Sequence, residues 1–119
     1  MKILCVDDSM IVRNAVTHEA RRTGHDCDEA KDATEGMEKL RKNRYSLVIL
    51  DYNMPGMSGL DMLRALQQEN LDTGPVVMLT TETSSTMKKA GQELGVKAWI
   101  VKPLKQGTME LILEKLARP

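Results

Sequence analysis

The chain has 119 residues, of which 41% are hydrophobic and 29% are charged, and its 17 basic side chains balance its 17 acidic ones. This length suits one globular domain over residues 1–119, and a net charge of zero argues against binding to nucleic acid or to a membrane surface. Two cysteines are too few for a disulfide framework, and no apolar run suits a signal peptide or a membrane span, so we expect a cytoplasmic protein.

In the first half of the chain, short strand-like runs alternate with segments of helical periodicity. We predict strands at residues 2–6, 26–30 and 46–50, and helices at residues 9–23 and 33–43. Ser9 or Asp8 can cap the first helix. The second strand is polar and short, which suits a sheet edge, whereas the third, "SLVIL", is continuously apolar, as in a strand covered on both faces.

The second half continues the alternation after a loop rich in turn-forming residues, "YNMPGMSG". We predict helices at residues 58–69, 86–94 and 107–117, and strands at residues 75–79 and 98–101. A β-α unit repeated five times, with apolar strands, predicts an α/β fold in which helices cover both faces of a parallel sheet. Right-handed crossovers restrict its topology further.

Polar side chains stand where four of the predicted strands end. Asp7 and Asp8 follow the first strand, Asp51 the third, Thr80 the fourth and Lys102 the fifth. Because the carboxyl ends of parallel strands share one edge of a sheet, we expect these groups to surround one crevice. Three carboxylates repel one another unless a cation such as Mg²⁺ joins them. With an ammonium nearby, the set suits phosphoryl transfer to a carboxylate nucleophile.

Each of these residues also has an ordinary structural explanation. An Asp pair ahead of a helix often serves as an N-cap, and an Asp at a strand end often forms a turn. A Thr after a strand is commonplace, and a Lys before a Pro is usually solvated. Capping and turns do not account for all of them standing together at the ends of four strands, so the pattern favours a functional site.

Four motifs resemble those of the CheY-like receiver domains of two-component response regulators. They are "VDDS" at 6–9, "LDYNMPGMSG" at 50–59, "LTTE" at 79–82 and "WIVKP" at 99–103. The resemblance covers nearly the whole chain. It implies a (βα)5 flavodoxin-like three-layer sandwich whose five-stranded parallel sheet has the order 2-1-3-4-5, an order that belongs to the family and does not follow from the hydrophobic pattern.

The resemblance also implies roles for the acidic residues of the crevice. Asp51 matches the phosphoacceptor, Asp8 the direct Mg²⁺ ligand, and Asp7 the second acidic residue, which is usually reached through water. Asn53 matches the position whose backbone carbonyl completes the metal shell, and Mn²⁺ is an alternative ion. Asn53 and Glu82 occupy the two positions that flank the attack path and tune dephosphorylation.

Further positions match the phosphate-contacting and switch residues of the family. Lys102 matches the lysine that pairs with the phosphoryl oxygens, and the Lys102–Pro103 peptide bond is similar to one that is often cis. Thr80 matches the hydroxyl that moves to the phosphate. Trp99 matches the aromatic position that then turns inward.

The implied function is a signalling switch that assists its own phosphorylation and dephosphorylation and is not a conventional enzyme. A histidine kinase or a histidine phosphotransfer protein would supply the phosphoryl group. The phosphorylated protein would remain a monomer and would change the face with which it binds other proteins. Control of a flagellar motor switch protein in chemotaxis is the leading expectation. A phosphorelay intermediate, a phosphate sink and a receiver cut from a longer regulator are the alternatives; the short tail after the last predicted helix favours a stand-alone protein.

Two positions depart from the family pattern at the point where phosphorylation would be sensed. Residue 99 is Trp where Tyr or Phe is commoner, and a larger indole would restrict inward rotation. Residue 81 is Thr where a small residue is usual, which would crowd the mouth of the crevice.

Two other protein classes fit less well. A haloacid dehalogenase-type phosphatase places a second Asp two residues after its nucleophile, where this chain has Asn53 after Asp51. A flavin binder of this fold needs a phosphate loop after the first strand, where "DDSM" is acidic.

Overall fold

The computed structural model describes residues 2–117; Met1, Arg118 and Pro119, which the single-domain prediction included, lie outside this range. The strands are β1 (Lys2–Val6), β2 (Asp26–Ala30), β3 (Leu47–Asp51), β4 (Val76–Thr80) and β5 (Val96–Val101). The helices are α1 (Met10–Arg22), α2 (Ala33–Lys42), α3 (Gly59–Gln68), α4 (Ser85–Glu93) and α5 (Thr108–Leu116).

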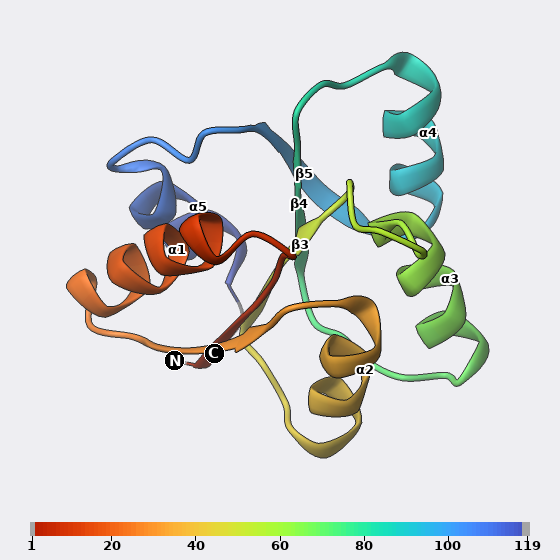
Figure 1. Ribbon diagram of the computed structural model, residues 1–119, viewed down its shortest axis with the longest axis horizontal. Coiled ribbons are helices and arrows are strands. Elements are labelled where there is room, and N and C mark those ends of the chain that lie inside the picture. Colours follow the sequence, from red (N-terminus) through yellow and green to blue (C-terminus); the bar gives the residue numbers. More distant parts are fainter. Residues whose placement is uncertain (1, 118–119) are drawn as a thin grey trace.

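The strands form one parallel sheet in the order β2-β1-β3-β4-β5, with helices on both faces. Helices α1 and α5 cover one face and α2, α3 and α4 cover the other (Figure 1). The predicted flavodoxin-like three-layer sandwich and its strand order are therefore confirmed. Across residues 2–117, no helix combines the length and the apolar character needed to traverse a lipid bilayer.

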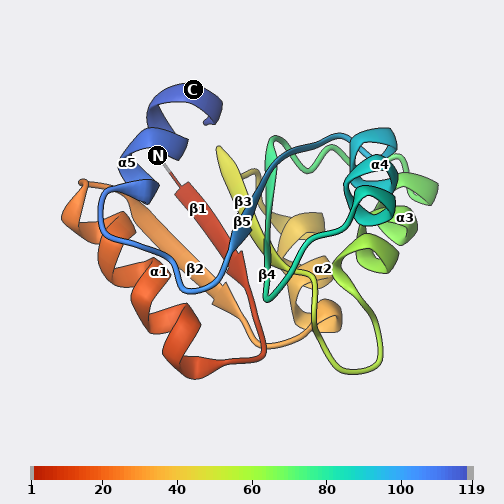
Figure 2. The ribbon, with the colours of Figure 1, turned by 90° about the horizontal axis from the view of Figure 1, so that it is seen from above.

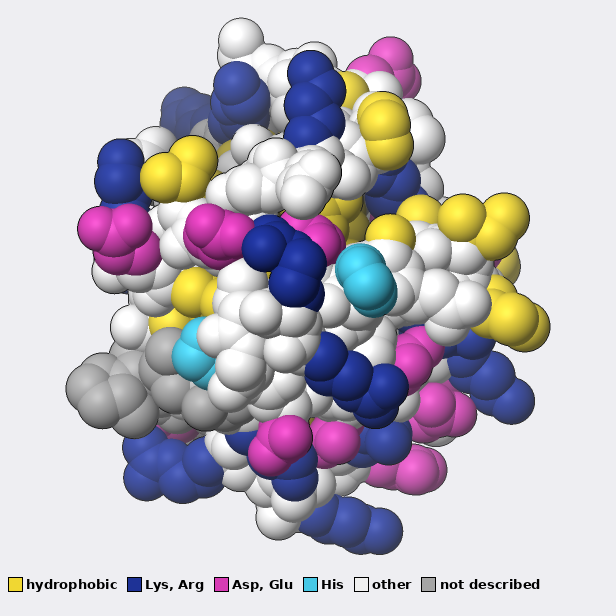
Figure 3. All heavy atoms as spheres, turned by 90° about the vertical axis from the view of Figure 1, so that its left-hand side faces the viewer, with side chains coloured by type: hydrophobic (Ala, Val, Ile, Leu, Met, Phe, Trp, Pro, Cys, Tyr) yellow, Lys and Arg dark blue, Asp and Glu magenta, His cyan; other side chains and the backbone are white. Residues whose placement is uncertain are grey.

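The central strands hold the fold together because both of their faces are covered. All five residues of β3 and all five of β4 are buried, and alternate side chains enter the two apolar cores above and below the sheet. The polar strand β2 lies at one edge of the sheet, as its composition predicted. The outer surface over α1 and α5 carries interspersed acidic and basic side chains (Figure 3), in keeping with the balanced charge.

The start of β5 differs from the prediction. The strand begins at Val96, whereas the apolar run predicted a start at residue 98. Gly95, with φ 85°, ends α4 and turns the chain directly into the strand. Exposed Lys97 interrupts the apolar pattern, and the β4–β5 register is irregular between Val76 and Val77. An edge strand tolerates such a charge because one of its sides has no partner strand.

Candidate functional site

Three carboxylates converge at the carboxyl edge of the sheet, the lower edge in Figure 2. Asp7, Asp8 and Asp51 each offer an oxygen within 4.8 Å of the others. Asp7 and Asp51 are completely buried, whereas Asp8 is exposed to solvent. The prediction placed Asp51 and Thr80 directly after their strands. In the structure, Asp51 is the last residue of β3 and Thr80 is the last residue of β4.

Asp7 is held in place by hydrogen bonds to β2 and to the start of α1. Its N–H donates to the carbonyl of Ala30 in β2 at 3.0 Å, and its Oδ1 accepts from the backbone N–H of Ser9 at 2.9 Å. The Arg13 guanidinium donates to the Asp7 carbonyl at 2.7 Å. Ser9, and not Asp8, caps α1 through a bond from the Val12 N–H. Asp8 is thereby left available for another role.

Asp51 is held through one of its two carboxylate oxygens. Its Oδ1 accepts from the Asn53 backbone N–H and from Lys102 Nζ, both at 3.0 Å. Gly59, at the start of α3, packs directly against the backbone of Asp51: a Cβ on Gly59 would lie 2.7 Å from the Asp51 carbonyl oxygen and 2.7 Å from Met78 Sδ. The motif "LDYNMPGMSG" at 50–59 ends in Gly59, but the sequence does not show what packs against this residue. A glycine in the first turn of a helix that follows a functional loop is the sequence feature that could have indicated this close packing.

We predict that Gly59→Ala destabilises the protein by about 1–3 kcal/mol, because the new methyl group would push Asp51 and Met78 apart. Urea unfolding followed by circular dichroism measures the change. Gln67→Ala, at an exposed position of the same helix, is the control and should change stability by no more than about 0.5 kcal/mol. Equal stability of Gly59→Ala and wild type would show that the contact is not tight in solution.

Lys102 lies between the two buried carboxylates. The residue follows β5, its backbone N–H donates to the Thr80 carbonyl at 2.8 Å, and its peptide bond to Pro103 is cis, the isomer that the resemblance implied. Nζ lies 3.0 Å from Asp51 Oδ1 and 3.1 Å from Asp7 Oδ2. A side chain that is only 17% exposed therefore places one positive charge against two fully buried negative ones.

Burial dominates the electrostatics of Asp51 and raises its pKa from 3.8 to about 6. The bonds from Asn53 and Lys102 oppose this rise, whereas the charge of Asp7 and the contact with Asp8 add to it. For Lys102, burial lowers the pKa, but pairing with Asp51 and Asp7 outweighs burial and holds the pKa above its ordinary value. The ammonium therefore stays charged while Asp51 titrates near neutrality.

One buried oxygen of this cluster lacks a partner. Within the described residues, Asp7 Oδ2 and Asp51 Oδ2 accept no hydrogen bond, although Asp7 Oδ2 faces Lys102 Nζ at 3.1 Å. Asp51 Oδ2 is the acceptor for which residues 2–117 supply no hydrogen-bond donor. A buried acceptor without a donor is costly, and three carboxylates with one ammonium leave two net negative charges. The oxygen donors present fit a hard divalent cation such as Mg²⁺.

Asn53 joins the β3–α3 loop to the end of β4. Its Oδ1 accepts from the Thr81 backbone N–H at 3.2 Å and lies 3.2 Å from the Thr80 hydroxyl. That hydroxyl has one proton, and its shorter contact, 2.7 Å, is to the Glu82 carbonyl. Thr80 is thus bonded within its own turn and not to Asp51. The Glu82 side chain is exposed and is not part of the carboxylate cluster.

Trp99 lies outside the carboxylate cluster, on the face of β5 covered by α4. It pairs in register with Met78 of β4 and packs against the core between the sheet and helices α2, α3 and α4. Its ring centroid is 6.1 Å from that of Tyr52 at a tilt of 55°. The indole is therefore already packed under α4 while Thr80 remains bonded to its own turn.

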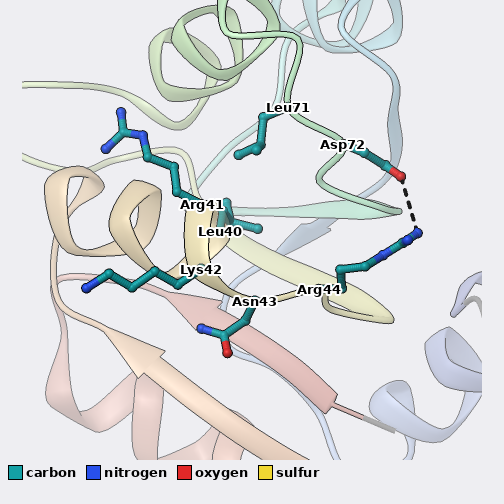
Figure 4. A pocket seen from close by; sticks show the side chains of 7 residues that line it. All are labelled: Leu40, Arg41, Lys42, Asn43, Arg44, Leu71 and Asp72. Atoms are coloured by element: carbon teal, nitrogen blue, oxygen red, sulfur yellow. Dashed lines mark ion pairs between the residues drawn. The ribbon is translucent and has the colours of Figure 1, made fainter.

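A cavity of about 280 Å³ lies at the opposite edge of the sheet, where the chain enters β3 and β4. It is lined by Leu40, Arg41, Lys42, Asn43, Arg44, Leu71 and Asp72. Arg41 and Lys42 extend to one side of it, and Arg44 extends to the other side, where it pairs with Asp72 at 3.7 Å (Figure 4). Arg41 forms two bonds to Glu69. No set of reactive groups converges in this cavity, so the carboxylate cluster is the better candidate site.

The comparisons with known proteins agree with this geometry. A family model described as the response regulator receiver domain matches residues 3–114. The chain belongs to the response regulator receiver family. It is 36% identical over 118 residues to the chemotaxis protein CheY-3 of Vibrio cholerae serotype O1, an alignment that covers 98% of this chain and 91% of that protein.

Solved receiver structures share the fold over almost the whole chain. The Vibrio cholerae chemotaxis protein CheY4 superposes with a TM-score of 0.88 at 36% identity and covers 97% of both chains. The Thermotoga maritima response regulator TrrA, solved in complex with Mg²⁺ and BeF, superposes with a TM-score of 0.81 at 26% identity over 96% of both chains. The chain is accordingly a receiver domain of the type found in chemotaxis response regulators.

Proposed function

We propose that the chain is a phosphorylation-activated signalling switch that accepts a phosphoryl group on Asp51. The observation that carries the proposal is the unpartnered, buried Oδ2 of Asp51 beside the Lys102 ammonium and two further carboxylates. A buried carboxylate with one free oxygen is suited to act as a nucleophile. A solved receiver of the same fold, the Thermotoga maritima protein TrrA, was obtained in complex with Mg²⁺ and BeF, which supports a phosphoryl-accepting role for this chain.

The protein's own residues divide the work of the reaction. Asp51 Oδ2 forms a bond to phosphorus as the bond from phosphorus to the donor histidine nitrogen breaks, and the electron pair of that bond stays on the nitrogen. Asp8 would hold Mg²⁺, or Mn²⁺, directly, Asp7 through water, and Asn53 through its backbone carbonyl. The ion would supply positive charge for the phosphoryl oxygens when it is bound. Lys102, already 3.0 Å from Asp51, stabilises the charge of the transferred group.

The switch would begin at Thr80. Its hydroxyl would leave the Glu82 carbonyl, now 2.7 Å away, for a phosphoryl oxygen, and this exchange would shift residues 80–82 and the start of α4. The altered face would bind a protein such as a flagellar motor switch protein, with the receiver acting as a monomer. A histidine kinase or a histidine phosphotransfer protein would be the donor. Asn53 and Glu82, beside the crevice, would tune hydrolysis of the aspartyl phosphate.

Labelling from a small phosphodonor tests the proposal. We expect radioactive acetyl phosphate with Mg²⁺ to label the wild type and to leave Asp51→Asn unlabelled, because the asparagine amide is not a nucleophile. Asp61→Asn is the control, since Asp61 is an exposed carboxylate on α3 whose loss should leave labelling intact. Removal of Mg²⁺ with EDTA should abolish the label. Label that persists on Asp51→Asn would place the acceptor elsewhere.

Mg²⁺ should also stabilise the folded protein. At a free concentration ten times its dissociation constant, a ligand that binds only the folded state adds about 1.4 kcal/mol to the free energy of unfolding. We expect this gain in thermal melts of the wild type and its loss in Asp8→Ala, which removes the proposed direct ligand. Asp32→Ala, which alters the N-cap of α2 and lies outside the cluster, should keep the Mg²⁺ response. An equal response in Asp8→Ala would contradict the ligand assignment.

A further inference from the structure

Helix α4 contains a glycine at the one place where it is deeply buried. Gly91 is the only residue of α4 that is buried, and it lies in the last turn of the helix, three residues before the C-cap residue Leu94. Glycine destabilises the interior of a helix relative to alanine, because it gains no packing and loses more backbone entropy. Its presence at the contact with the sheet therefore points to a packing requirement.

That requirement is the indole of Trp99. A Cβ on Gly91 would lie 2.5 Å from Trp99 Cζ2, 3.1 Å from Cε2 and 3.2 Å from Nε1. The indole is a rigid plane, so a methyl group cannot be accommodated by bending one end of the side chain. Tyr52 packs on it at 6.1 Å and Met78 lies beside it on the sheet. Because Gly91 has no side chain, the helix leaves a space that the indole ring fills.

The same ring supplies much of the anchorage of α4. Helix α3 buries Leu60, Met62, Leu63 and Leu66. Helix α4 buries only Gly91 and has Ala90 and Met87 half-covered, while its remaining residues are exposed. A large aromatic side chain can bury roughly 150–250 Å². Few buried apolar contacts mean a low local stability, so α4 depends on Trp99 to stay docked.

We propose that Gly91 is a positioning residue that admits the Trp99 indole beneath α4, and that this contact docks α4 on β5 before phosphorylation. The indole already occupies its packed position while Thr80 is bonded to Glu82. The relay step that we propose is therefore a movement of α4 and not inward rotation of the partly buried Trp99. Release of α4 from the indole is the movement that carries the signal, and this last step rests on the proposed function at Asp51.

The docking of α4 on β5 through Gly91 and Trp99 can be tested without a phosphodonor or a metal ion. Trp99 is the only tryptophan, so tryptophan emission reports on the surroundings of this one indole. In Gly91→Ala we expect red-shifted emission, stronger quenching by acrylamide and faster hydrogen exchange over residues 85–93. Gln92→Ala, exposed on the same helix, should leave all three unchanged. Wild-type emission and exchange in Gly91→Ala would overturn the proposal.

A compensating variant separates a specific contact from a general loss of folding. Gly91→Ala combined with Trp99→Leu should partly restore slow exchange of α4 relative to Gly91→Ala alone, because leucine leaves room for the methyl group and still offers the helix an apolar surface. Restoration supports the contact even where Gly91→Ala fails to fold. Exchange as fast in the double variant as in the single one would overturn it.

The release of α4 from the Trp99 indole is tested by adding BeF₃⁻, a mimic of the phosphoryl group, with Mg²⁺ to the wild type. This addition should accelerate hydrogen exchange over residues 85–93. Binding is followed independently by the rise in thermal stability. Binding with unchanged exchange of α4 would overturn the relay while leaving the function at Asp51 intact. An absence of binding would overturn the function, and with it the relay, while the docking result in the unliganded protein would still hold.

Discussion

Replacing Lys102 with methionine should lower the free energy of unfolding by about 3–5 kcal/mol at pH 7 in the absence of divalent cations. Methionine keeps the length of the side chain but removes the charge. Nζ lies 3.0 Å from Asp51 Oδ1 and 3.1 Å from Asp7 Oδ2, and neither carboxylate is exposed to water. Two buried negative charges would lose their shared counter-ion. Urea unfolding at low ionic strength measures the loss.

A surface ion pair of the same type provides the control. Lys2 Nζ lies 3.3 Å from Asp28 Oδ2, but these side chains are 42% and 33% exposed, so Lys2→Met should cost no more than about 1 kcal/mol. Adding Asp51→Asn to Lys102→Met should recover part of the loss, because one of the two unpaired charges is then absent. Equal losses in Lys102→Met and Lys2→Met would show that water reaches the pocket and screens it.

The convergence of this pocket was predictable because it depends on topology and not on side-chain packing. Asp7, Asp8, Asp51 and Lys102 stand at strand ends, and a parallel sheet brings those ends to one edge. The exact strand limits were less predictable: Asp51 and Thr80 pair within their strands. The apolar run alone does not show where ladder hydrogen bonding stops.

Close approaches between separate elements were not predictable from local pattern. Gly59 meets Met78, Gly91 meets Trp99, and the Asn53 side chain meets the end of β4. Each pair depends on the distance between a helix or loop and the sheet, which hydrophobic periodicity does not encode. A glycine inside a helix indicates that something packs closely there, but it does not identify the partner. The rotation of Trp99 and the tuning of dephosphorylation by Glu82 stay predictions, because each concerns the phosphorylated protein.

Replacing Asp51 with asparagine should have the opposite effect on stability from the lysine variant. The folded protein holds the pKa of Asp51 at about 6, against an ordinary value of 3.8, chiefly because the carboxylate is buried. The difference corresponds to about 3 kcal/mol by which the folded state disfavours the charged form. Asparagine carries no charge, and the pKa of about 6 already includes the bond from Lys102, so we expect a gain of about 1–3 kcal/mol at pH 7.

The pH dependence distinguishes this cause from any other stabilising effect of the amide. Between pH 3.8 and about 6, the folded wild type binds more protons at Asp51 than the unfolded chain does, so the Asp51 contribution to stability falls as pH rises through this window. Well below pH 3.8 the carboxyl is protonated in both states, and the advantage of Asp51→Asn should disappear; most of it should already be lost at pH 4. Asp61→Asn, at an exposed carboxylate, should show no such pH-dependent gain. If the gain from Asp51→Asn were the same at pH 4 and pH 7, desolvation of the charged carboxylate would not be its source, because only the ionised form of Asp51 carries that penalty.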